Sequence, residues 1–133
     1  TVELVKKARF KNSFVFKYSP RPGTDSANNL PDDVPEEIKR QRNLDLLAIQ
    51  NTISEEESSK LLDKTVKVLV EGLSKKPHVN MAENGNNPQL IGRTANDYIV
   101  VFNGPESLTG TFTAVEIVKT SALTMFGKIK YNL

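Results

Sequence analysis

The stretch Phe14–Thr24, Phe-Val-Phe-Lys-Tyr-Ser-Pro-Arg-Pro-Gly-Thr, marks the point where the character of the chain changes. Its first half places Phe14, Phe16 and Tyr18 on one face by alternation, and this period of two predicts a β-strand. Two prolines then remove backbone donors, and Gly23 permits a turn that other residues rarely adopt. A hydrophobic strand that runs into a rigid basic loop is typical of the ligand-facing rim of an α/β sheet.

The residues before this stretch predict a short helix. From Thr1 to Phe10, the apolar side chains of Val2, Leu4, Val5 and Ala8, with Lys6 and Lys7 between them, are typical of a short amphipathic helix. A helix followed by a strand is half of a βαβ repeat, and one strand cannot complete a sheet. We therefore expect the first 24 residues to be the last α–β unit of a parallel sheet or barrel, cut from a longer protein that supplies the earlier strands. The alternative is a small α+β fold in which this strand pairs with strands later in the chain.

A long helix is predicted in the middle of the chain. The segment from Asp25 to Asp33 is polar and is interpreted as a loop. Asp33 followed by Glu36 fits a capping box, and the helical pattern continues from there to about Leu62. A break near Ser54 stays open, because the acidic residues that follow it fit a second helix start.

After Asp63 the period changes to two, which predicts strands separated by turn residues. Five short strands in the second half are typical of a small closed antiparallel barrel of the oligonucleotide-binding kind. The fold class is therefore α+β, with residues 1–62 forming one domain and residues 63–133 the barrel. The expected strands are Thr65–Glu71, Gln89–Thr94, Tyr98–Phe102, Thr111–Lys119 and Thr124–Tyr131.

Composition excludes several classes of protein. The 133 residues contain no cysteine and a single histidine, His78, so disulfides, iron–sulfur ligation by this chain, a thiol nucleophile and a histidine-based metal site are not expected. No long apolar run predicts a membrane span, and we expect a soluble protein. The formal net charge of +2 is too small to establish an anionic partner.

Several short motifs in this order resemble one enzyme family. They are Tyr18-Ser19-Pro20-Arg21-Pro22-Gly23-Thr24, Val34-Pro35-Glu36-Glu37, Gln50, Val68-Leu69-Val70-Glu71-Gly72 and Gly92-Arg93-Thr94. Together they are similar to the C-terminal part of the radical-SAM methylthiotransferases, with the end of the radical-SAM α/β barrel, a long helix and a terminal TRAM domain. Arg21 favours the tRNA-modifying branch, because the branch that modifies an aspartate of a ribosomal protein usually carries acidic residues there.

The resemblance implies a function that extends beyond this chain. Full-length enzymes of the tRNA branch hold two 4Fe–4S clusters, cleave S-adenosylmethionine, and place a methylthio group on isopentenyl-adenosine beside the tRNA anticodon. Since this chain has none of the cluster cysteines, it is expected to bind no cofactor and to be inactive alone. The implied partner is the anticodon stem–loop of tRNA, and the implied location is the cytoplasm. Two departures are a long loop at Lys76–Pro88 and Asp63 where the family often has glycine, so we expect a different helix exit.

Candidate RNA-binding residues fall in the second half. Lysines and arginine would contact phosphates, because phosphate neutralisation dominates affinity for nucleic acids. A tyrosine would stack on an unpaired base, and a threonine and an asparagine would reach sugar or base edges. The alternatives are a solvated loop for the lysines, a turn for the polar pair and barrel core for the aromatic residues. The candidates are Lys75, Lys76, Arg93, Thr94, Asn96, Tyr98 and Lys119, while Phe112 and Phe126 are assigned to the core.

The first half offers a second candidate site in the loop around Arg21. Its guanidinium would bind a substrate phosphate or a cofactor carboxylate, or else pair with a carboxylate and fix the loop. Tyr18 and Ser19 belong to the same loop and are expected to pack and tie the turn. Phe14 and Phe16 need cover, so the chain is also expected to self-associate through this strand.

Three functions remain open from sequence. The first is the tRNA-binding end of a methylthiotransferase. The second keeps the family but takes a ribosomal protein as target. The third is a binding or assembly module without a nucleic-acid role, which predicts that Lys75, Lys76 and Arg93 scatter over the surface.

Overall fold

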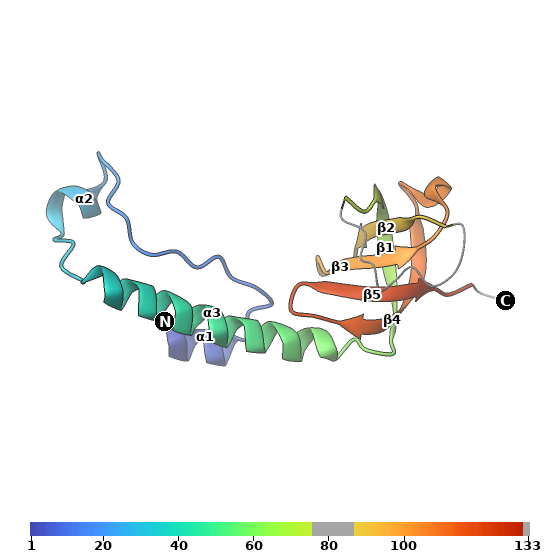
Figure 1. Cartoon of the computed structure of the whole chain (residues 1–133), viewed down its shortest axis with the longest axis horizontal. Helices are drawn as coiled ribbons and strands as arrows, with labels where there is room; N and C mark the ends of the chain where they lie inside the picture. Colours follow the sequence, from blue (N-terminus) through green and yellow to red (C-terminus); the bar gives the residue numbers. More distant parts are fainter. Residues whose placement is uncertain (76–86, 132–133) are drawn as a thin grey trace. The chain divides into compact units, whose positions relative to one another are not determined.

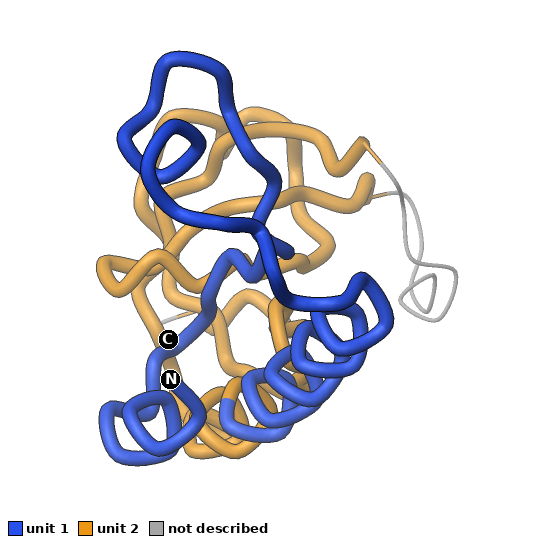
Figure 2. Tube along the Cα trace, turned by 90° about the vertical axis from the view of Figure 1, so that its left-hand side faces the viewer, with its two compact units in different colours: residues 1–53 blue, residues 54–133 orange. Residues whose placement is uncertain are grey.

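A computed structural model describes residues 1–75 and 87–131, which form two compact units, Thr1–Ile53 and Ser54–Leu133 (Figure 2). Lys76, His78 and most of the predicted Lys76–Pro88 loop lie outside the described residues.

The helices match the sequence pattern in part (Figure 1). Helix α1 spans Val2–Ala8, as expected, and α3 runs unbroken from Glu36 to Ser59, with its last six residues in the second unit. There is no break at Ser54. The predicted capping box is wrong, because Pro35 directly precedes the helix and its carbonyl accepts the first helical bond, from Lys39 N.

A third helix lies where a loop was expected. Helix α2 covers Asp25–Asn29. The Thr24 hydroxyl oxygen accepts from Ala27 N at 3.2 Å, and the same hydroxyl donates to the Arg21 carbonyl at 2.8 Å. Gly23 has φ 83°, so the turn before the helix uses the left-handed conformation that glycine permits. Threonine as N-cap and aspartate in the first turn were the sequence signals for this helix.

The predicted strand from Phe14 to Tyr18 does not form. Residues 12–20 are extended but belong to no sheet, and the side chains of Phe14 and Phe16 are 89% and 83% exposed. A strand needs a neighbour to satisfy its backbone, and the described part of the first unit holds no strand. Pairing with the later strands, the alternative α+β fold, is also absent because those strands pair only with one another.

Gln50, which is 5% exposed, holds the start of the chain against α3. Its amide nitrogen donates to the Phe10 carbonyl at 2.7 Å, and its amide oxygen accepts from the Ser13 hydroxyl at 2.7 Å. These bonds fix the chain that leaves α1 to the middle of α3. The first unit is therefore ordered by a buried polar clamp and by buried Val5 and Ile53 rather than by a sheet.

The second unit is a closed barrel, as predicted. Its strands follow the order β1-β2-β3-β5-β4, and β4 pairs with β1 to close it. The expected antiparallel arrangement holds for four of the five strand pairs, while β3 and β5 are parallel. The strands are β1 (Thr65–Leu73), β2 (Gln89–Arg93), β3 (Ile99–Asn103), β4 (Phe112–Thr120) and β5 (Thr124–Ile129), with a 3₁₀ turn, η2 (Glu106–Leu108), before β4.

Alternation along these strands builds the core and a polar outside. Val68, Val70 and Phe102 point inward and are at most 1% exposed. Gly92 allows β2 to approach β1, because a Cβ there would lie 2.4 Å from the Leu69 carbonyl oxygen. Asp63, just before β1, has φ 61°, in the left-handed region that favours glycine. Among the described residues, none of the helices combines the length and the hydrophobicity of a membrane-spanning segment.

Candidate nucleic-acid interface

The β2–β3 hairpin brings four of the predicted RNA-binding residues together. Thr94 N donates to the Tyr98 carbonyl at 3.0 Å, and the Thr94 hydroxyl accepts from Tyr98 N at 3.1 Å. Arg93 ends β2 immediately before this turn, and Asn96 is exposed within it. Thr94 therefore ties the turn, as the structural alternative held, while Asn96 stands at its tip.

Arg93 is paired with two carboxylates on the barrel surface. Its Nε lies 3.0 Å from Glu71 Oε1, and its Nη1 donates to Asp97 Oδ1 at 2.6 Å. The Asp97 carboxylate raises the pKa of the guanidinium, and Glu71 adds to this. The two carboxylates hold the planar group in place and offset its charge.

Tyr98 is half-buried at the edge of the core. It packs against the core cluster, and this burial raises the pKa of the phenol, with Glu57 adding to the effect. Phe102, at the other end of the same predicted strand, is fully buried in that cluster.

The two other predicted cations that the structure describes, Lys75 and Lys119, do not gather around the hairpin. Lys75 follows Ser74, whose N donates to the Gln89 carbonyl at 2.9 Å. Gln89 is at the opposite end of β2 from Arg93, four residues or roughly 13 Å along the strand. Lys119 lies near the end of β4, with Nζ 5.7 Å from the centroid of the buried Phe126 ring. Among the described candidates, the structure brings together Arg93 and the turn but not the lysines.

Phe112 was assigned to the core, and this is wrong. Its side chain is 62% exposed at the start of β4, and Lys67 Nζ lies 4.5 Å from its ring centroid. Val115 and Ile117 point inward, so alternation puts Phe112 on the outer face. This alternation was the signal in the sequence that Phe112 lies on the outer face. Phe126, in contrast, is buried as predicted.

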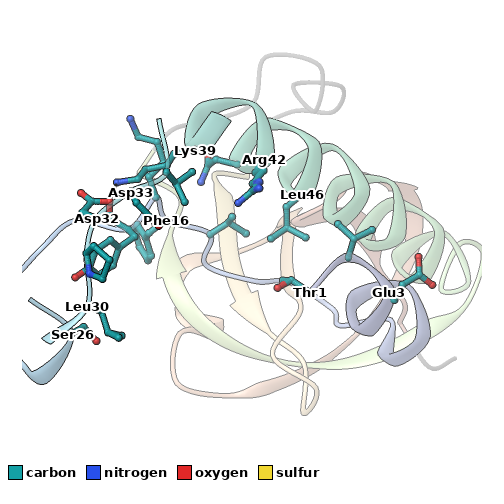
Figure 3. Close-up of a pocket in the computed structure, with 17 residues that line it drawn as sticks. Thr1, Glu3, Phe16, Ser26, Leu30, Asp32, Asp33, Lys39, Arg42 and Leu46 are labelled. Atoms are coloured by element: carbon teal, nitrogen blue, oxygen red, sulfur yellow. Dashed lines mark hydrogen bonds and ion pairs between the residues drawn. The ribbon is translucent and has the colours of Figure 1, made fainter. Parts of the chain in front are cut away.

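The loop around Arg21 lies beside a pocket in the first unit (Figure 3). Tyr18 lines this pocket of about 980 Å³, and both Tyr18 and Ser19 line a smaller one of about 400 Å³ that adjoins it. Arg21 lines neither and is exposed. The ion pair expected as the structural alternative for Arg21 does not form within the described residues, and Thr24, not Tyr18 or Ser19, ties the turn.

Both apolar and charged side chains line the larger pocket. Lys39 forms an ion pair with Asp32, and its Nζ lies 5.5 Å from the Tyr18 ring centroid. Lys17 pairs with Glu36, which lowers the pKa of that carboxyl. Figure 3 shows Lys39, Arg42 and Leu46 on α3, with Phe16 on the extended segment and Leu30, Asp32 and Asp33 on the connection to α3.

The residues present do not fit an iron–sulfur cluster. The chain has no cysteine, and no group of three or more potential ligands occurs among the described aspartate and glutamate side chains. Any cluster of the implied enzyme would take its ligands from elsewhere.

Comparison with known protein families matches residues 60–130 to the TRAM domain. This range contains all five strands of the barrel. The chain belongs to the TRAM domain family. The predicted resemblance is thereby confirmed for the barrel.

Curated relatives extend the match over nearly the whole chain. The tRNA-2-methylthio-N(6)-dimethylallyladenosine synthase of Rhodopirellula baltica is 46% identical over 98% of this chain and 27% of its own length. The enzymes of the same name from Porphyromonas gingivalis and Chlorobium limicola are 39% and 37% identical over 97% and 99% of the chain. The chain spans about a quarter of the length of these relatives. The resemblance to tRNA methylthiotransferases, predicted from the motifs, is confirmed.

Proposed function

We propose that this chain is the tRNA-binding C-terminal part of a radical-SAM methylthiotransferase that modifies isopentenyl-adenosine beside the anticodon. One observation carries the proposal. The TRAM match coincides with the closed barrel, in a chain whose relatives along nearly its full length are named for a tRNA modification. The barrel would supply affinity for the anticodon stem–loop, and α3 would connect it to the rest of the enzyme.

The roles of single residues are part of this proposal. The β2–β3 hairpin would reach sugar or base edges through Thr94 and Asn96, with Tyr98 beside them. Arg93 would contact a phosphate by exchanging a carboxylate partner for it. Lys75, Lys76 and Lys119 would contribute phosphate contacts along the backbone of the RNA.

The first unit would contribute residues that bind substrate or cofactor in the full-length enzyme. Arg21, exposed in a fixed turn, would bind a substrate phosphate or the carboxylate of S-adenosylmethionine. Tyr18 and Ser19 would line its approach. The two 4Fe–4S clusters and the cofactor would belong to the remainder of the enzyme, in the cytoplasm, with residues 1–62 as the end of its barrel domain and residues 63–133 as the RNA-binding domain.

A salt titration tests RNA binding. A labelled anticodon stem–loop is titrated with the chain between about 50 and 200 mM salt, and log K is expected to fall by roughly 0.7–0.9 per unit of log salt for each phosphate contacted. Replacing Lys75, Arg93 and Lys119 together by glutamine should reduce the magnitude of this slope by about two to three times the contribution of one phosphate. The control is Lys6→Gln with Lys7→Gln, since both lysines lie on α1. Absence of salt-sensitive binding by the unmodified chain contradicts the proposal.

The separation of Lys75 and Arg93 favours one competing function, a binding or assembly module without RNA. That function predicts the same weak response to the stem–loop and to an unrelated polyanion such as heparin. A clear preference for the stem–loop, lost in the triple variant, excludes it.

A further inference from the structure

Three side chains form a row across the outer face of the barrel. Phe112 on β4 stands opposite Leu69 on β1, and Leu69 stands opposite Arg93 on β2. Directly paired residues of antiparallel strands lie on the same face, with Cβ atoms about 4.5–5.5 Å apart. Phe112 and Leu69 are 62% and 38% exposed, so the row presents an open apolar surface that ends in the guanidinium held by Glu71 and Asp97.

A cation accompanies the exposed ring. Lys67 is the diagonal neighbour of Phe112, since it pairs with Ala114, and its Nζ lies 4.5 Å from the ring centroid. The other lysine–phenylalanine pair of the barrel described above, Lys119 and Phe126, has a ring that is only 9% exposed. Phe112 is therefore the ring of the two that a ligand can reach.

The closed sheet restricts how this face can bind a partner. Every strand of the barrel has a neighbour on both sides, so the described sheet has no free edge at which a peptide strand could add. Binding here must use side chains. Lysine is depleted in the cores of protein interfaces, whereas an aromatic ring with an adjacent cation is the combination that single-stranded nucleic acids use.

We propose that Phe112 is a stacking platform for an unpaired RNA base, with the Lys67 ammonium contacting the adjoining phosphate. The base would lie on the exposed face of the ring, Leu69 would extend the apolar contact, and the Arg93 plane would flank it. The inference rests on the proposed function, because it assigns a further contact to the same RNA-binding barrel.

Substitutions separate stacking from general electrostatic attraction. Phe112→Ala and Phe112→Leu should each weaken binding of the labelled stem–loop by roughly 5- to 100-fold, since base–aromatic stacking is lost and the leucine restores only apolar bulk. Their salt slope should equal that of the unmodified chain, whereas Lys67→Gln should lower the slope by about 0.7. The control is Leu123→Ala, because Leu123 is also 62% exposed but lies in the turn between β4 and β5.

A fluorescent reporter tests the contact directly. The chain contains no tryptophan, so Phe112→Trp introduces a single indole at the site and Leu123→Trp one at the control position. Quenching of the indole fluorescence of the Phe112→Trp variant by the stem–loop, but not by a blunt RNA duplex, supports stacking of an unpaired base. Without RNA, a spectral change with protein concentration that Phe112→Trp shows and Leu123→Trp does not would indicate contact of position 112 with a second copy and would overturn the proposal.

The outcomes distinguish this inference from the function on which it rests. If the unmodified chain binds neither the stem–loop nor the duplex, the proposed function and the stacking site are both overturned. If it binds the stem–loop and Phe112→Ala binds as tightly as Leu123→Ala, with unchanged urea midpoints in all variants, RNA binding stands and the stacking site is overturned.

Discussion

At the scale of single residues, Gly92 is a position with no room for a side chain. A Cβ there would meet the Leu69 carbonyl oxygen at 2.4 Å and Val68 Cγ1 at 2.5 Å. Because backbone cannot rotate away, Gly92→Ala should destabilise the barrel by about 1–3 kcal/mol through overpacking. Urea unfolding followed by circular dichroism should show a lower midpoint.

The comparison residue is Gly104, where an added Cβ would meet the ends of flexible side chains, Ile129 Cδ1 at 2.7 Å and Leu90 Cδ1 at 3.3 Å. Gly104→Ala should therefore cost less than Gly92→Ala. Equal midpoints for the two variants would contradict this account of the close approach between β1 and β2.

At the scale of elements, sequence periodicity predicts what local pattern alone determines. The five strands and α3 follow from alternation and helical spacing, and their observed bounds differ from the expected ones by a few residues. Phe14–Tyr18 has equally strong alternation yet forms no strand, since a strand also needs a partner and none is present in the described part of the first unit. Helix α2 was missed because its five residues are too few to show a period, so the Thr24 cap was the signal.

The clamp between α1 and α3 yields a prediction for the first unit. Gln50→Ala would leave the Phe10 carbonyl and the Ser13 hydroxyl without their partner in a half-buried place, which costs roughly 1–3 kcal/mol. Hydrogen exchange should show faster exchange of the α1 amides, with the barrel amides unchanged. The matched control on the same helix is Gln41→Ala, since Gln41 is exposed and bonds to Asp45 within its own helix turn. Equal effects of the two substitutions would show that the clamp contributes nothing.

At the scale of the whole molecule, the sequence predicts the type of the site better than its geometry. Motif order identified the family, and the hairpin residues Arg93, Thr94 and Asn96 are neighbours because they are close in sequence. Whether Lys75 lies on the same surface as Arg93 depends on strand order and register. The residue types alone do not reveal either. The same limit hid Phe112, whose exposure follows from the inward direction of Val115 and Ile117.

Self-association is the prediction that belongs to the molecule as a whole. Phe14 and Phe16 are 89% and 83% exposed, and burying a phenylalanine side chain stabilises by about 1.5–3 kcal/mol. Two such rings on an extended segment outside any sheet favour contact between copies of this chain. Sedimentation velocity should therefore show a sedimentation coefficient that rises with protein concentration, and Phe14→Ser with Phe16→Ser should abolish the rise. Leu123→Ser removes another exposed apolar side chain, from the second unit, and should leave association intact. A chain that stays monomeric at every concentration, or a double variant that associates as before, would show that these rings are stable in water without a partner copy.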